Sequence, residues 1–296
     1  MNLSGPFTLI LAMLFSALMA IFLKAFPSGK NNRYSILVGN YITCILLAFF
    51  LLPDKGVIYS PERMTLLCGT ISGVLFVASL VVMQASIGKN GAILTAAFGK
   101  LGLLVPLTFS ILLLHERPSL LQWIGIALVF LALWFINQAA NDMMNGERQV
   151  KKAAAKSGLV LLLIVLLVSG VTDGMAKVFE HLGSRSQDDL YILIVFVVAG
   201  VLATILLVQE YRLRDKKIKL KDFVAGFAVG VPNYFSSILL LKALTKLPAF
   251  IVYPAFSTGT ILIITLVSTI VFKEKPGRKQ VIGLVIILAA LLLLNL

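Results

Sequence analysis

Long apolar runs separated by short polar segments are the dominant pattern of this chain. A bilayer core about 30 Å thick needs about 20 apolar residues in a helix, because backbone polar groups in lipid must pair within the helix. The pattern therefore predicts an all-α integral membrane protein with ten transmembrane helices. These cover residues 6–26, 35–52, 64–87, 91–114, 119–138, 157–178, 189–209, 221–244, 248–272 and 279–296.

Two stretches of the chain match each other. Residues 69–137 align with residues 227–295 at a constant offset of 158 without a gap, and fifteen of the 69 positions are identical. The most informative matches are polar or conformationally special: Glu116 with Glu274, Pro118 with Pro276, Gln122 with Gln280, and Gly125 with Gly283. The chain is therefore expected to hold one unit written twice, at residues 1–138 and 157–296, joined by a polar linker at 139–156.

The number of spans in each copy predicts the architecture. Five is odd, so the second copy must enter the membrane from the side opposite to the first. This is an inverted-topology repeat, which is typical of secondary transporters that open alternately to either side.

Composition agrees with a membrane protein, since 59% of residues are hydrophobic, 13% are charged and the mean hydropathy is +0.99. The chain has 26 Lys and Arg against 13 Asp and Glu. This excess lies in short loops between apolar runs, which fits an anionic membrane surface and argues against a nucleic-acid partner. Cys44 and Cys68 lie inside apolar runs and are expected to pack there. No metal, cofactor or catalytic residue is expected.

Loop charge predicts the orientation in the membrane. Loops after odd-numbered spans carry eighteen Lys and Arg, and the opposite side carries seven. Under the positive-inside rule both termini are extracytoplasmic, in a multi-pass protein of the plasma (inner) membrane. The first residues carry no Lys or Arg ahead of the first apolar run, unlike a cleaved signal peptide.

In each copy a helical hairpin is followed by the motif Glu-x-Pro-x-x-x-Gln-x-x-Gly, at Glu116–Gly125 and Glu274–Gly283. With ten spans in two copies, the chain resembles the EamA-type branch of the drug/metabolite transporter superfamily. That resemblance implies a central cavity lined by the first four spans of each copy, with the fifth and tenth at the periphery. It also implies cytoplasmic termini, contrary to the loop charge. Similar proteins carry amino acids, sugars, choline-like cations, nucleotide sugars or drugs.

Ionisable side chains near the bilayer midplane are costly and usually functional. Lys100 lies near the middle of the fourth span between Gly99 and Gly102, and its counterpart in the second copy is Thr258. We expect Lys100 to face the cavity and bind an anionic group; the alternative is a structural partner such as a buried carboxylate.

Asp173 and Lys177 are one helical turn apart in the sixth span, so they can form an internal ion pair. The functional alternative makes Asp173 the proton-coupling site or the partner of Lys100, with Lys177 beside it in the solute site. Lys24, Lys177 and Lys242 lie close to span ends, where long amines reach the headgroups.

Uncharged polar residues inside spans complete the candidate site. They are Asn40, Tyr41, Gln84, Asn233, Tyr234 and Tyr253. For each one, a hydrogen bond between helices and a contact with solute both remain open. Pro106, Pro232 and Pro254 are expected to kink their helices. Glu116 and Glu274 are expected to start the fifth and tenth spans.

The leading interpretation is a secondary active transporter of a small polar metabolite, carboxylate-bearing or zwitterionic and amino-acid-like. The two copies would rock about a central site, driven by the solute gradient or by protons. An exporter of drugs or apolar compounds is the alternative within transport. A membrane-embedded enzyme or a receptor is the alternative of another class. Monomer and dimer both remain open.

Overall fold

The computed structural model describes residues 4–25, 33–90, 95, 98–99, 101–112, 115–144, 155–214, 220–271 and 277–294. In this part of the chain all regular structure is helical, which confirms the all-α class. The α-helices are α1 (Gly5–Ala25), α2 (Arg33–Phe50), α3 (Arg63–Asn90), α5 (Leu104–Leu112), α6 (Leu120–Met144), α7 (Ala155–Leu182), α8 (Asp188–Arg214), α9 (Leu220–Leu244), α10 (Ala249–Val271) and α11 (Arg278–Leu294). Two short 3-10 helices are η1 (Lys55–Ile58) and η3 (Arg185–Gln187).

Length and composition make several of these helices able to cross a bilayer. Six of them are long and apolar enough to span it, and three shorter apolar helices accompany them. This indicates a multi-pass membrane protein. Nine of the ten predicted spans coincide with one helix each, which begins within two residues of the predicted start. Helix α6 runs on to Met144, so it enters the region predicted as the linker.

The predicted span at 91–114 is not a single helix in the described residues. Gly102 and Leu103 form a turn, and α5 begins only at Leu104. Pro106 therefore lies in the first turn of α5, where a missing N–H is tolerated, and does not kink a longer helix as the sequence suggested. Helices α9 and α10 run through Pro232 and Pro254.

The chain folds into two compact units. The first unit comprises residues 1–77 and 175–246, and the second comprises residues 78–174 and 247–296. The boundaries fall inside α3 and α7, so each of these helices contributes to both units. Each unit also combines helices from both predicted copies.

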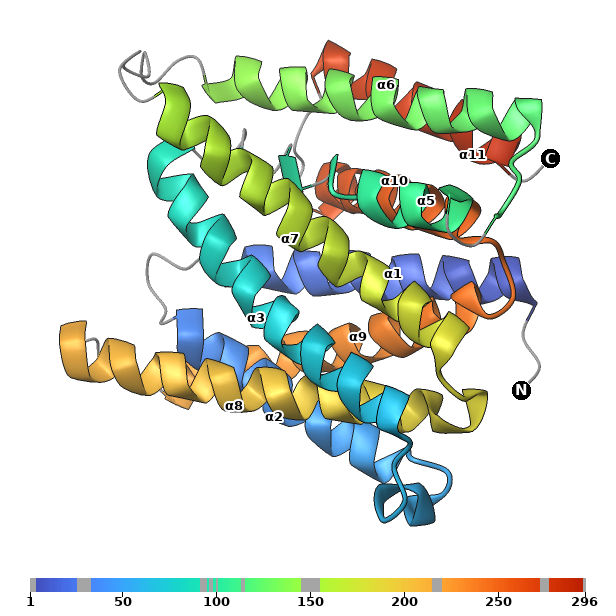
Figure 1. Ribbon diagram of the computed structural model, residues 1–296. Coiled ribbons are helices and arrows are strands. Elements are labelled where there is room, and N and C mark those ends of the chain that lie inside the picture. The colour runs from blue at the N-terminus through green and yellow to red at the C-terminus, as the bar shows by residue number, and fades with distance from the viewer. Residues whose placement is uncertain are drawn as a thin grey trace. The chain divides into compact units, whose positions relative to one another are not determined.

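In the first unit, α9 packs against α1 and α2, and α2 packs against α8 (Figure 1). Its core is a cluster of buried apolar side chains that includes Tyr41, Phe179, Phe196 and Leu241.

In the second unit, α6 and α11 run side by side, and α10 packs against α5, α6 and α11 (Figure 1). Its core contains Leu107, Val129, Phe250 and Leu294. Each unit thus has its own hydrophobic core, and the polar residues inside the helices can be examined within the unit that holds them.

Candidate functional site

Two asparagines predicted as site residues meet each other in the first unit. Asn233 on α9 donates a hydrogen bond of 3.1 Å from its Nδ2 to Oδ1 of Asn40 on α2. Both residues are buried. Cys44, one turn further along α2, lies beside them, with its Sγ 3.3 Å from the carbonyl oxygen of Gly230. Of the two readings left open by the sequence, the structure therefore shows a hydrogen bond between helices for this pair.

Glycines explain why α2 and α9 come so close. A Cβ added to Gly226 would lie 2.3 Å from the carbonyl oxygen of Ile36 and 2.9 Å from Cα of Gly39. A Cβ on Gly230 would lie 2.6 Å from the carbonyl oxygen of Asn40. Gly226 and Gly230 form the small-x-x-x-small spacing that lets membrane helices touch backbone to backbone. This contact places Asn233 within reach of Asn40.

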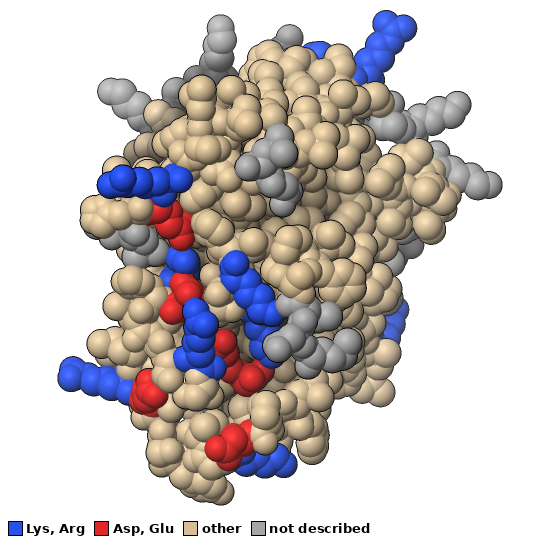
Figure 2. Space-filling model, turned by 90° about the vertical axis from the view of Figure 1, so that its right-hand side faces the viewer, with Lys and Arg blue, Asp and Glu red and all other residues tan. Residues whose placement is uncertain are grey.

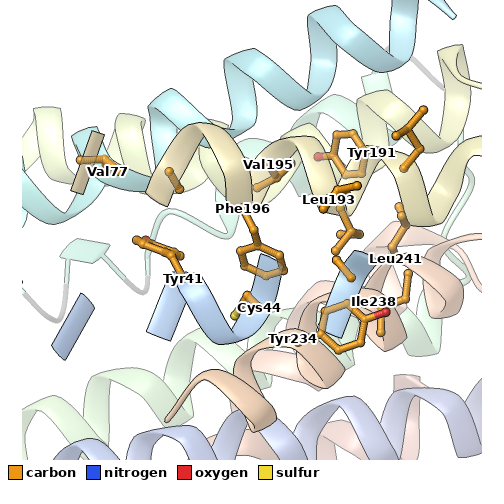
Figure 3. Packing of buried hydrophobic residues seen from close by; sticks show 14 of the residues in the cluster. Tyr41, Cys44, Val77, Tyr191, Leu193, Val195, Phe196, Tyr234, Ile238 and Leu241 are labelled. Atoms are coloured by element: carbon orange, nitrogen blue, oxygen red, sulfur yellow. The ribbon is translucent and has the colours of Figure 1, made fainter. Parts of the chain in front are cut away.

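Tyr41 and Tyr234, also predicted as site residues, belong to the hydrophobic core of the first unit. Their exposures are only 2% and 3%. The Phe196 ring on α8 lies between them, with centroid distances of 6.3 Å to Tyr41 and 6.5 Å to Tyr234. Figure 3 shows these three rings with Cys44 among the packed side chains. Their surroundings are those of packing residues.

Lys177 is buried in the first unit, and its Nζ donates to Oε2 of Glu180 at 2.8 Å. The two side chains are only 9% and 13% exposed. Lys242, near the end of α9, lies 3.5 Å from Oδ1 of Asp189, and its side chain is 45% exposed. Neither Glu180 nor Asp189 is predicted as a partner from the sequence. The spacing of Glu180, three residues after Lys177 on one helix, is a readable signal, whereas Asp189 and Lys242 lie on different helices. The side chain of Lys24 lies outside the described residues.

Asp173 and Tyr253 meet in the second unit. The Tyr253 hydroxyl on α10 donates a hydrogen bond of 2.8 Å to the main-chain carbonyl oxygen of Asp173 on α7. Tyr253 is buried, whereas Asp173 is exposed. The bond ties α10 to α7 through the backbone, so the Asp173 carboxylate does not receive it.

Further polar groups of the second unit lie on α3 and α7. Ser79 Oγ on α3 and Ser169 Oγ on α7 are 3.3 Å apart. Gln84, a predicted site residue, is half-buried one to two turns further along α3. Ser169 and Asp173 are one turn apart on α7 and therefore share a face. Helix α7 thus presents a polar face within this unit.

The turn at Gly102, just before α5, lies against α7. A Cβ on Gly170 would lie 2.4 Å from the carbonyl oxygen of Gly102, so the two backbones are in contact. Gly102 N–H bonds to the carbonyl oxygen of Gly99, and Val105 N–H bonds to that of Gly102, both three residues apart. Lys100 itself lies outside the described residues. Its counterpart Thr258 is fully buried and donates to the carbonyl oxygen of Pro254 on its own helix.

The segment with the Glu-x-Pro motif of the first copy caps two helices, α6 and α10. Ser119 Oγ accepts from Gln122 N–H at 3.2 Å, and Gln122 Oε1 accepts from Ser119 N–H at 2.8 Å. This reciprocal capping box starts α6, a role that the sequence predicts for Glu116. That assignment is wrong. The Glu116 carboxylate instead accepts from Ala249 N–H at 3.0 Å and Phe250 N–H at 3.4 Å, at the start of α10. Glu274 and Pro276 lie outside the described residues.

No group of three or more His, Cys, Asp or Glu among the described residues could hold a metal ion. The free cysteines Cys44 and Cys68 are both buried.

Comparisons with known proteins show several similarities. A model of the EamA-like transporter family matches residues 3–138 and 156–296. An uncharacterized protein of Haemophilus influenzae is 24% identical over 292 residues, which is 96% of this chain and 95% of that protein. An uncharacterized protein of Methanocaldococcus jannaschii is 29% identical over 104 residues, covering 35% of this chain and 75% of that protein. One solved crystal structure matches 98% of this chain and 95% of its own, with a TM-score of 0.78 at 11% identity, which shows a shared fold alone.

Proposed function

Because the chain belongs to the EamA-like transporter family, we propose that it is a secondary active transporter of a small, zwitterionic or carboxylate-bearing metabolite. Family membership makes it a membrane transporter of the drug/metabolite transporter superfamily, as the resemblance in the sequence predicted. The solute class, the alternating-access cycle and the use of a solute or proton gradient are the proposal.

The observation that carries the proposal is the environment of Asp173. It lies well inside α7, a helix long and apolar enough to span a bilayer, yet its side chain is exposed. A carboxylate at the centre of a span costs about 2.5–3.5 kcal/mol on insertion scales if it faces lipid. An exposed carboxylate at this depth is therefore best accommodated in a water-filled space, which is what a solute pathway provides.

The groups around Asp173 suit a zwitterion. The carboxylate of Asp173 offers a contact for an ammonium group or a site for a coupled proton. Ser169, one turn before it on α7, adds a neutral hydrogen-bonding group. Gln84 lies toward the start of α7, away from Asp173, because the contacts of Ser79 with Ser169 and of Asn90 with Gly158 show that α3 and α7 run antiparallel. In this proposal Lys100, placed by sequence in the predicted span 91–114, binds the solute carboxylate. Tyr253 holds α10 against α7 at the level of Asp173.

The predicted site residues of the first unit have contacts that suit a structural role. Asn233 donates a hydrogen bond to Asn40, Tyr41 and Tyr234 pack in an aromatic core, and Lys177 pairs with Glu180. We therefore propose that these five residues stabilise the first unit and that solute contacts lie in the second.

A direct test measures uptake by purified protein in liposomes. Each amino acid of a labelled panel is compared with its own amide and decarboxylated amine, which keep the side chain but lose the carboxylate. The proposal expects uptake of at least one amino acid and at least tenfold less of its amide and amine. Uptake of apolar dyes with no uptake of any amino acid would favour the exporter of apolar compounds instead. Absence of movement of every compound would overturn transport of this solute class.

A further inference from the structure

The first turn of α10 has no capping side chain of its own. Pro248 occupies the cap position, because its carbonyl oxygen accepts from the N–H groups of Ile251 and Val252, both at 3.1 Å. A proline side chain has no oxygen with which to bind the free N–H groups of Ala249 and Phe250. Those two residues are only 0% and 4% exposed, so water is a poor substitute.

Glu116 supplies the missing acceptor from a distant part of the chain. Its carboxylate oxygens lie 3.0 and 3.3 Å from Ala249 N and 3.4 Å from Phe250 N, at a separation of 133 residues from Ala249. A negative charge at a helix N-terminus also interacts favourably with the helix dipole. The cap of α10 is thus made by the connection between α5 and α6, in the first predicted copy.

The connection between α5 and α6, which carries Glu116, is itself held in a special conformation. His115 has a φ of 54°, in the left-handed region that a non-glycine residue rarely adopts. Glu116 N–H bonds back to the carbonyl oxygen of Ser110 on α5 at 3.1 Å. Pro118 and the capping box at Ser119 follow directly. A strained backbone conformation persists only where the surrounding structure holds it in place. The strain at His115 therefore indicates that the orientation of the neighbouring Glu116 matters.

The capped turn lies next to the candidate solute site. Tyr253 follows Ala249 by four residues and shares its face of α10. Its hydroxyl bonds to the backbone of Asp173. The start of α10 is therefore fixed at two consecutive turns, first by Glu116 and then by α7.

From these contacts we infer that Glu116 is a positioning residue, which sets the height and orientation of α10 and so the placement of Tyr253 beside Asp173. The expected effect on transport rests on the proposed function, whereas the role of Glu116 in positioning α10 does not depend on it. Without the Glu116 carboxylate, the first turn of α10 opens more often. The hydrogen bond from the Tyr253 hydroxyl to the Asp173 carbonyl oxygen is then formed for less of the time. Solute affinity then falls although Glu116 does not touch the solute.

Hydrogen exchange tests the structural claim without any transport assay. Purified Glu116→Ala, Glu116→Gln and Ser119→Ala proteins are compared with the unmodified protein. Ser119→Ala is the matched control, because it removes a cap from α6 in the same connection between α5 and α6. We expect at least tenfold faster exchange in the first turn of α10 for Glu116→Ala and a smaller change for Glu116→Gln. Ser119→Ala should affect only the start of α6. Unchanged exchange in α10 for Glu116→Ala would overturn the inference.

Kinetics then test the link to Tyr253. Uptake of the amino acid found in the liposome panel should show a KM raised at least fivefold in Glu116→Ala, with a smaller change in maximal rate, and a normal KM in Ser119→Ala. If Glu116 acts through Tyr253, then Glu116→Ala combined with Tyr253→Phe should raise KM no further than the more severe single change. Multiplicative effects would contradict that route. If Glu116→Ala keeps full uptake while Asp173→Asn loses uptake, the positioning role of Glu116 is wrong and the proposed function is still supported.

Discussion

Asn233 on α9 donates a hydrogen bond of 3.1 Å to Asn40 on α2, where glycines bring the two helices into backbone contact. Hydrogen bonds between membrane helices contribute about 0.6 kcal/mol on average and up to about 1.7 kcal/mol. Asn233→Leu should therefore lower thermal stability modestly, because it leaves the buried Oδ1 of Asn40 with only the weak thiol donor of Cys44, whose Sγ is 4.0 Å away. Combining it with Asn40→Leu should recover part of the loss, since both polar groups are then removed. Thermal unfolding in detergent measures both effects; a double variant that loses the sum of the two single losses would contradict this account of the pair.

The close approach of α2 and α9 makes Gly226 intolerant of any side chain. In Gly226→Ala the new methyl group would lie 2.3 Å from the carbonyl oxygen of Ile36, and a backbone atom cannot move aside as a flexible side chain can. Overpacking costs about 1–3 kcal/mol. We expect a clear loss of thermal stability and of folded protein in membranes. Gly277→Ala is the matched control, because nothing lies within 4 Å of its added Cβ. Equal yields for the two variants would show that the helices are not in contact there.

The two ion pairs of the first unit should differ in their importance. Glu180→Gln removes the carboxylate that lies 2.8 Å from the buried ammonium of Lys177, and breaking a pair in a buried setting is more costly than breaking one at the surface. Asp189→Asn removes the partner of a lysine whose side chain is 45% exposed, and such pairs contribute about 0–1 kcal/mol. Thermal unfolding should therefore show a much larger loss for Glu180→Gln. A larger loss for Asp189→Asn would reverse this ranking.

Tyr253→Phe removes one hydroxyl and keeps the buried ring. The lost bond to the backbone of Asp173 is of a kind that contributes about 0.5–1.5 kcal/mol, so uptake efficiency should fall about threefold to tenfold. Thermal stability should fall slightly. Uptake at the normal efficiency, measured as maximal rate over KM, would mean that this contact does not shape the solute site.

Much of the fold follows from the sequence because the bilayer sets the length of each apolar run. Nine helices start within two residues of the predicted positions. The turn at Gly102 was missed, because Pro106 nearby suggested a kink and a backbone contact with Gly170 cannot be read from local pattern. The capping box at Ser119 and Gln122 was readable from spacing alone.

Hydrogen-bond partners that lie far apart in the sequence could not be predicted from it. Asn40 and Asn233 were each identified as polar residues in a span, but their pairing depends on how α2 and α9 pack. Glu116 was recognised as a helix cap and assigned to the adjacent helix, because capping is normally local. Its true partner is fixed by tertiary structure, at the start of α10.

The central claim is that Asp173 serves solute transport through a water-accessible site in the second unit. Its most direct test is entrance counterflow in liposomes, with an amino acid from the panel inside and its labelled form outside, comparing Asp173→Asn with the matched control Asp54→Asn. Asp54 is an exposed loop residue that caps Gly56 through its side chain, so it undergoes the same chemical change away from the site. We predict at least a tenfold loss of counterflow for Asp173→Asn at normal thermal stability and full activity for Asp54→Asn. Full counterflow by Asp173→Asn would contradict the account.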